Sequence, residues 1–171
     1  MNLANKITMF RMIMVPVFLL VVSLDFKYGI YVATAIFIIA AFSDTLDGYI
    51  ARSRNQVTNF GKFMDPLADK LIVISALVYL VEAALIPAWV VMIIIARELA
   101  VTGLRTIAAS EGIVLAAGPW GKAKTVTQMI AIVATLLSIS FYGILVAIAV
   151  VLTIISGVDY FVKNKGVLKF N

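Results

Sequence analysis

Six apolar stretches separated by short polar connections constrain what this chain can fold into. They cover Met12–Leu24, Tyr28–Phe42, Leu71–Val81, Ala83–Ala96, Val126–Ser140 and Gly143–Ile155. Each stretch is shorter than the roughly 20 residues that a helix needs to cross a bilayer core, so each needs a polar extension. The extended segments are Thr8–Leu24, Tyr28–Ala51, Pro66–Val81, Pro87–Ala108, Lys122–Ile139 and Phe141–Val162. The pattern predicts an all-α polytopic membrane protein with six transmembrane helices, in which residues 1–171 form a single domain.

The composition agrees with lipid as the main solvent and limits the chemistry that is available. Hydrophobic residues make up 63% of the chain and charged residues only 13%, which is far more apolar than a soluble domain requires. The chain has no Cys and no His, which excludes thiolate nucleophiles, disulfides, imidazole bases and the usual zinc sites. Any reaction must therefore use carboxylates, hydroxyls, Lys, Arg and hard metal ions.

The distribution of cations predicts the orientation of the helices. With six spans and both termini on one side, all of the 14 Lys and Arg residues except Lys27 lie on that side. The positive-inside rule makes it the cytosolic face. The same topology brings the polar ends of the second to fifth helices together there, where they are expected to form a polar cavity. The residues placed at this face are Asp44, Asp47, Asp65, Asp69, Arg97, Arg105, Lys122 and Lys124.

Four aspartates lie at helical spacing around the connection between the second and third spans. Asp44 and Asp47 are three residues apart. Asp65 and Asp69 are four apart, so each pair shares one face of a helix. Four carboxylates in a low-dielectric setting repel one another or stay protonated unless cations lie among them. Without His or Cys the fitting ions are Mg²⁺ or Mn²⁺, with Ca²⁺ also possible, and two such ions serve in-line displacement at phosphorus. The cluster therefore predicts phosphate chemistry.

Small and basic residues accompany the aspartates. Gly48 and Ala51 share their helix face and leave a notch in which a nucleotide or pyrophosphate could approach the backbone. Arg52 offers a forked, permanently charged donor for phosphate. Pro66 leaves two alternatives for Asp65 open: it caps the third helix with Pro66 at the first position, or it lies at a kink.

Two other interpretations of these acids are weighed against the metal centre. The first is a solvated loop in which the aspartates pair with Arg52, Arg54, Lys62 and Lys70. The second is a small cation transporter, because acids inside a membrane often mark ion pathways. A transporter would spread its acids along the depth of several spans, whereas these four cluster at one end. The regular spacing beside small residues likewise favours a metal centre over a loop.

The aspartate segment reads D-x2-D-G-x2-A-R-x8-G-x3-D-x3-D, and this string resembles the signature of the CDP-alcohol phosphotransferase family. The resemblance extends over nearly the whole chain. It implies that two divalent metal ions are held by Asp44, Asp47, Asp65 and Asp69, and that Asp69 is also the base that deprotonates the acceptor alcohol. It further implies that the CDP lipid is bound by Gly48, Ala51, Arg52 and Gly61.

Three further segments resemble the members of this family that use glycerol 3-phosphate as acceptor: Asn5–Arg11, Arg97–Arg105 and Gly121–Thr125. The implied reaction converts CDP-diacylglycerol and sn-glycerol 3-phosphate into phosphatidylglycerophosphate and CMP. Inositol phosphate or another polar alcohol is the alternative acceptor.

A dianionic acceptor needs several fixed cations, and the sequence supplies Arg97, Arg105, Lys122 and Lys124. For Arg97 the alternatives are an ion pair with the adjacent Glu98 or snorkelling at a helix end, and for the other three they are anchors at the membrane surface. Lys122 and Lys124 are two apart on a helix and cannot both point the same way.

The resemblance also implies a homodimer, and no nucleic-acid partner is expected. The predicted location is the prokaryotic cell membrane, with the active site and both termini on the cytosolic side. Tyr160, near the end of the last span, is interpreted as an aromatic residue of the membrane interface.

Overall fold

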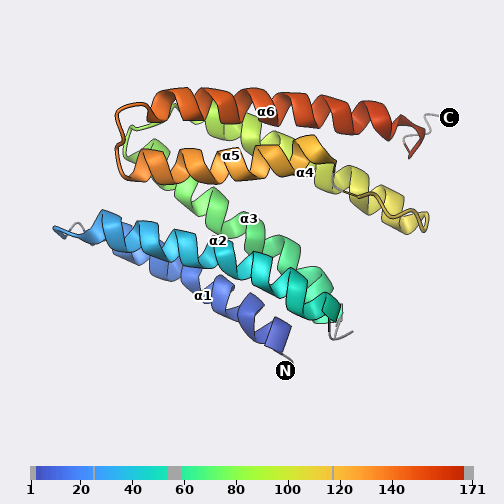
Figure 1. Ribbon diagram of the computed structural model, residues 1–171, viewed down its shortest axis with the longest axis horizontal. Coiled ribbons are helices and arrows are strands. Elements are labelled where there is room, and N and C mark those ends of the chain that lie inside the picture. Colours follow the sequence, from blue (N-terminus) through green and yellow to red (C-terminus); the bar gives the residue numbers. More distant parts are fainter. Residues whose placement is uncertain (1–2, 25, 54–58, 117, 168–171) are drawn as a thin grey trace. The chain divides into compact units, whose positions relative to one another are not determined.

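The computed structural model describes residues 3–24, 26–53, 59–116 and 118–167; within these ranges the side chains of 3–4, 44–53, 59–63 and 65–66 are not described. The described residues form six α-helices and one short 3₁₀ helix, without any strand, which confirms the all-α prediction for this part of the chain (Figure 1). The helices are α1 (Leu3–Ser23), α2 (Gly29–Ser53), α3 (Asn59–Glu82), α4 (Ala88–Ser110), α5 (Pro119–Leu136), α6 (Tyr142–Lys163) and η1 (Lys165–Val167).

Helix α3 differs from its predicted bounds. The sequence predicts a start at Pro66, but the helix begins at Asn59 and its backbone runs through Asp65 and Pro66. The alternative in which Asp65 caps this helix is therefore wrong. The error arose because hydropathy marks only the apolar part of a helix, whereas backbone hydrogen bonding continues into polar turns beyond it.

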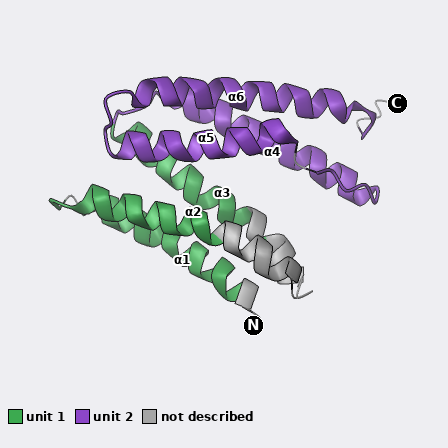
Figure 2. Ribbon diagram, viewed as in Figure 1, with its two compact units in different colours: residues 1–83 green, residues 84–171 purple. Residues whose placement is uncertain are grey.

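The chain divides into two compact units, which are described separately (Figure 2). Unit 1 covers residues 1–83 and contains α1, α2 and α3, each of which packs against the other two. Unit 2 covers residues 84–171, and in it α6 packs against both α4 and α5 while η1 packs against α4.

Small residues allow the helices of unit 1 to approach one another closely. In α2, Ala33, Phe37 and Ala40 are fully buried at spacings of four and three, which form one stripe along the helix. In α3, Ala68 and Ala76 are also fully buried. Alanine side chains let helix backbones come together, and this is how helices associate where lipid removes the hydrophobic driving force. Small buried residues therefore lie on both α2 and α3, which pack against each other.

The two units present large apolar side chains on their surfaces and bury several polar ones. Thr34 in unit 1, and Thr135 and Thr153 in unit 2, are buried and donate their hydroxyls to carbonyl oxygens four residues earlier in their own helices. Side chains such as Leu20 and Ile144 are more than 60% exposed. This distribution suits a lipid environment, in which outward apolar side chains cost nothing.

Two helical segments within the described residues are long and apolar enough to cross a bilayer: Asn5–Ser23 and Tyr142–Lys163. A third apolar segment, Gly29–Ser43, is shorter. The described residues contain the six α-helices that were expected, and length and composition mark two of them as candidate spans.

Helices α4 and α5 end in the same backbone motif. After each helix one residue has a left-handed φ, which is 74° at Gly112 and 51° at Ser138. The next residue, Ile113 or Ile139, donates its N–H to the carbonyl oxygen five residues earlier, at 2.9 and 3.0 Å. This pattern is the Schellman motif, in which glycine is the usual left-handed residue. The end of α5 carries a serine in that place.

We expect Ser138→Gly to stabilise the protein by about 1 kcal/mol, because glycine lacks the Cβ that disfavours this conformation. For a chain of this size the melting temperature should rise by about 2–4 °C. Gly112→Ala is the matched opposite change and should lower the melting temperature by a similar amount. A Cβ at Gly112 meets nothing within 4 Å, so only the conformational free energy of the backbone changes. Identical melting temperatures in all three proteins would contradict this account.

Candidate functional site

Asp69 of α3 forms an ion pair with Arg11 of α1 inside unit 1. The Arg11 Nη1 donates to the Asp69 Oδ1. The Arg11 side chain is only 1% exposed, whereas that of Asp69 is 39% exposed. The carboxylate is therefore held from one side by a buried cation and is accessible from the other. Sequence reasoning identified Asp69 but assigned Arg11 no role. The recurrence of polar residues at Asn5, Thr8 and Arg11, three positions apart on one helix face, is the sequence feature that could have indicated one.

The other predicted metal ligands and CDP-lipid residues have side chains outside the described part of the structure: Asp44, Asp47, Gly48, Ala51, Arg52, Gly61 and Asp65. The backbone of α2 is helical through Asp44 and Asp47, and the backbone of α3 is helical through Asp65 and Asp69. These two helices pack against each other and are joined only by residues 54–58, so all four positions lie toward the same end of unit 1. Among the side chains that the structure describes, no group of three acids could hold a metal ion.

The donor chemistry of this end of unit 1 fits a hard divalent cation. The predicted ligands are all carboxylates, and the accessible Asp69 carboxylate has oxygens of the kind that Mg²⁺ and Mn²⁺ prefer. No imidazole or thiolate is present in the chain to select a softer ion.

Unit 2 contains a second charged cluster, formed by Arg97 and Glu98 of α4 with Lys124 of α5. The Arg97 Nη1 lies 3.0 Å from the Glu98 Oε1, and the Lys124 Nζ donates to that same oxygen. All three side chains are largely shielded, with exposed fractions of 14%, 21% and 5%. The structure thus brings two of the predicted acceptor-site cations together through a shared carboxylate. The predicted alternative of an Arg97–Glu98 pair is observed, and Lys124 joins it.

Two glycines leave room for the Arg97 side chain. A Cβ built on Gly157 of α6 would lie 3.2 Å from the Arg97 Cγ, and one built on Gly121 of α5 would lie 3.8 Å from its Nη2. The first distance is tighter than ordinary contact, so a larger residue at Gly157 would displace the arginine. All three helices of unit 2 therefore define the position of this guanidinium.

From the sequence, Glu98 was considered only as an ion-pair partner of the adjacent Arg97. An Arg–Glu doublet interrupts the apolar run Val90–Ala96, and that interruption is the feature that could have marked both residues. The contact with Lys124, 26 residues away, could not be read from the doublet itself.

The remaining two predicted acceptor cations lie elsewhere on unit 2. Arg105 is eight residues beyond Arg97, about 12 Å along the helix. Its Nε donates to the Tyr160 hydroxyl at 2.9 Å. Lys122 is exposed while Lys124 is buried, so the two point apart as their spacing predicts. Tyr160 itself is only 6% exposed, so its interpretation as an interface residue is wrong: the ring packs with Val101 and Leu104 of α4.

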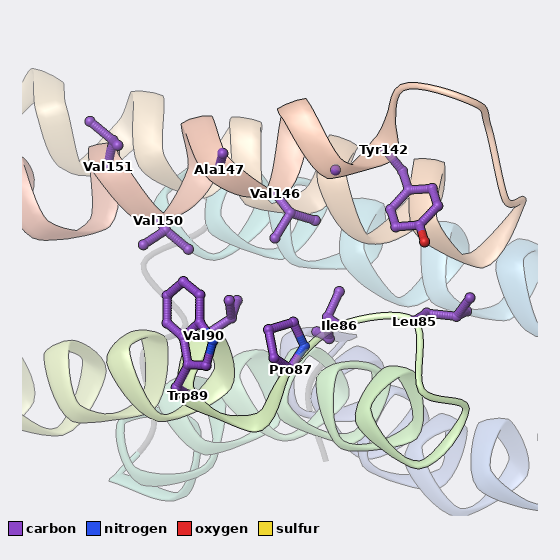
Figure 3. A pocket seen from close by; sticks show the side chains of 11 residues that line it. Leu85, Ile86, Pro87, Trp89, Val90, Tyr142, Val146, Ala147, Val150 and Val151 are labelled. Carbon is purple, nitrogen blue, oxygen red and sulfur yellow. The ribbon is translucent and has the colours of Figure 1, made fainter.

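A pocket of about 370 Å³ lies in unit 2 between the start of α4 and the start of α6 (Figure 3). Pro87 and Trp89 line one side and Tyr142 and Val146 the other. The lining includes no charged residue, so the pocket is unsuited to phosphate chemistry.

Comparisons with known proteins agree with the site chemistry. Residues 1–155 match the model of the family described as CDP-alcohol phosphatidyltransferase. A Bacillus subtilis (strain 168) protein named CDP-diacylglycerol–glycerol-3-phosphate 3-phosphatidyltransferase is 46% identical, over 98% of this chain and 97% of its own length. A Haemophilus influenzae protein of the same name is 39% identical, over 99% of this chain and 97% of its own length. A Mycobacterium tuberculosis (strain H37Rv) protein named probable phosphatidylglycerophosphate synthase is 42% identical, over 93% of this chain and 79% of its own length.

Proposed function

This chain belongs to the CDP-alcohol phosphatidyltransferase family, and on that premise we propose that it transfers the phosphatidyl group of CDP-diacylglycerol to sn-glycerol 3-phosphate. The products are phosphatidylglycerophosphate and CMP. The observation that carries the proposal is the complete four-aspartate pattern on α2 and α3, in a chain that is similar over nearly its whole length to proteins named for this reaction.

Two divalent ions, Mg²⁺ or Mn²⁺, would be held by Asp44, Asp47, Asp65 and Asp69. When bound, such ions stabilise the charge on the entering and leaving oxygens of a phosphoryl displacement. The packing of α2 against α3 and the carboxylate-only donor set support this assignment.

In the proposed reaction Asp69 accepts the proton of the acceptor hydroxyl. The hydroxyl oxygen forms a bond to the phosphorus nearest the diacylglycerol, and the bond from that phosphorus to the CMP oxygen breaks. The CDP group fits in the room left by Gly48, Ala51 and Gly61. Arg52 binds the negatively charged phosphate of the departing CMP. The accessible side of the Asp69 carboxylate supports its role as the base.

The phosphate of the acceptor binds to the cations of unit 2 in this proposal. Arg97 and Lys124 share Glu98, and the three side chains together carry one net positive charge in a shielded setting, where electrostatic attraction is strong. The same function is assigned to Arg105 and Lys122, which bind the acceptor phosphate as it enters from solvent.

The proposed setting of the reaction is the prokaryotic cell membrane, with the active site and both termini facing the cytosol. Residues 1–171 act as a single domain of six spans, and the enzyme is a homodimer. The two apolar spans, the exposed apolar side chains and the positive-inside charge distribution support the membrane location, and the family match across both units supports the single domain.

Release of CMP from CDP-diacylglycerol tests the proposed reaction. The purified chain with Mg²⁺ or Mn²⁺ should release CMP when glycerol 3-phosphate is added, and should release much less with inositol phosphate or other polar alcohols. If inositol phosphate is preferred, the assigned acceptor is wrong, while the assigned phosphatidyl transfer stands. Ion conductance in liposomes without CMP release would show that the protein is a cation transporter and not this enzyme.

Arg105→Ala should raise the KM for glycerol 3-phosphate roughly 10- to 100-fold while changing the KM for CDP-diacylglycerol less than about twofold, because a charge-assisted phosphate contact is lost. Steady-state kinetics with each substrate varied in turn measures both constants. Tyr160→Phe removes only the hydroxyl that Arg105 contacts, so it should have a smaller effect. Equal changes in both KM values for Arg105→Ala would argue against an acceptor role.

A further inference from the structure

The first turns of α1 present a polar face that is buried within unit 1. Asn5, Thr8 and Arg11 recur every three residues, and their exposed fractions are 8%, 1% and 1%. Burial of such groups in an apolar helix is unfavourable unless they serve a partner. The N-terminal end of α1 lies at the same end of unit 1 as the C-terminal end of α2 and the N-terminal end of α3 (Figure 1). The polar residues of α1 therefore lie at the end of the unit that carries the aspartates.

Arg11 is the member of this face whose partner is defined. Its guanidinium engages one oxygen of Asp69, 58 residues away in the sequence. The exposed fraction of the Asp69 side chain is 39%, so the contact fixes the carboxylate without covering it. The guanidinium that carries the donating Nη1 is planar and rigid, so the contact limits how the carboxylate can rotate.

From this contact we infer that Arg11 is a positioning residue for Asp69, and that it also offsets part of the negative charge of the aspartate site. The inference rests on the proposed function, because it takes Asp69 as a metal ligand and base. The four aspartates carry four negative charges, and Arg11 reduces their sum by one before any metal ion binds. Arg11 therefore limits how tightly divalent cations are held, while it keeps the Asp69 carboxylate oriented for the acceptor proton.

The two parts of this role predict changes of opposite sign when Arg11 is neutralised. Arg11→Gln should tighten metal binding roughly tenfold, because a positive charge next to the site is lost. It should also lower kcat roughly 10- to 100-fold, because the carboxylate loses its fixed orientation. A residue that served only the fold would not combine tighter metal binding with slower turnover.

The experiment compares the full-length purified chain with its variants in two measurements. The first is the Mn²⁺ concentration that gives half of the maximal rise in melting temperature, with Mn²⁺ alone and no lipid substrate. The second is kcat for CMP release at saturating metal. Lys6→Gln is the matched control: it removes one positive charge from an exposed position on the same helix, and both quantities should stay within about twofold of wild type.

Two further variants keep the test decisive. In an Asp69→Asn background, Arg11→Gln should lower kcat less than about twofold further, because the orientation of the Asp69 carboxylate no longer matters there. It should still tighten Mn²⁺ binding, because the charge of Arg11 acts on the whole aspartate site. Arg11→Lys keeps the charge and loses the fork, so Mn²⁺ binding should stay near wild type while kcat falls; this variant decides the question if Arg11→Gln does not fold.

Unchanged or weaker Mn²⁺ binding in Arg11→Gln would overturn the inference, as would a full further loss of kcat in the Asp69→Asn background or wild-type kcat in Arg11→Lys. These results would leave the proposed function intact if the wild-type chain still shows its Mn²⁺-dependent rise and releases CMP. A wild-type chain that does neither would overturn the proposed function and this inference together.

Discussion

Asp69→Asn is expected to lower kcat by about 10²–10⁴-fold, which is the contribution of a well-placed general base. The amide is nearly the same size as the carboxylate but cannot accept the proton of the acceptor hydroxyl. Binding of CDP-diacylglycerol should change little, because that lipid is assigned to Gly48, Ala51, Arg52 and Gly61. Single-turnover CMP release and equilibrium binding of the CDP lipid measure the two quantities separately. A near-normal kcat would reject the assignment of Asp69 as the base.

Asp159→Asn provides the matched control for this substitution. Asp159 lies on α6 and forms an ion pair with Lys163, one turn further on, at 2.8 Å. That pair is partly exposed and is assigned no part in the reaction, so its loss should leave kcat within about twofold of wild type, as expected for a surface ion pair. A large loss of activity in this control would mean that any Asp to Asn change harms the protein in general.

Removal of divalent metal is expected to have the second large effect. With excess chelator, CMP release should fall by at least about 10³-fold, because metal ions supply several kcal/mol of charge stabilisation in the transition state. The double variant Asp44→Asn with Asp65→Asn should lose activity to a similar extent, since it removes one ligand from α2 and one from α3. The rate of CMP release from CDP-diacylglycerol measures both effects.

Restoration of the metal controls the chelation experiment. Mg²⁺ or Mn²⁺ added beyond the chelator should return the wild-type rate, and neither ion should rescue the double variant at concentrations that saturate wild type. Zn²⁺ should be a poor substitute, because the site lacks the imidazole and thiolate donors that zinc prefers. Persistent CMP release in chelator would overturn the two-metal mechanism.

Helix positions were predicted well where polarity changes sharply. The predicted spans Pro87–Ala108 and Phe141–Val162 correspond to α4 (Ala88–Ser110) and α6 (Tyr142–Lys163) within two residues at each end. The predicted start of α3 was seven residues too late because the first turns of this helix mix polar with apolar residues and carry Asp65 and Pro66. Hydropathy reports where a helix is apolar, and it is silent where a helix extends into polar surroundings.

Sequence alone determined the chemistry available at the site. The absence of His and Cys leaves carboxylates as the only metal donors of the expected kind, and the spacing of the four aspartates follows the period of a helix, which is a local property of the chain. The family signature adds the roles that these residues are expected to have. None of this depends on how one helix packs against another.

The tertiary structure alone decided which side chains of different helices contact one another. It pairs Asp69 with Arg11 across 58 positions, joins Lys124 to Glu98 across 26, and buries Tyr160, which its position near a span end had assigned to the membrane interface. The physical reason is that periodicity defines which residues share a face of a helix but not which neighbour that face meets. The neighbour of each face depends on how whole helices rotate and approach one another. Close approach is possible only at positions that carry small residues, such as Ala68 and Gly157.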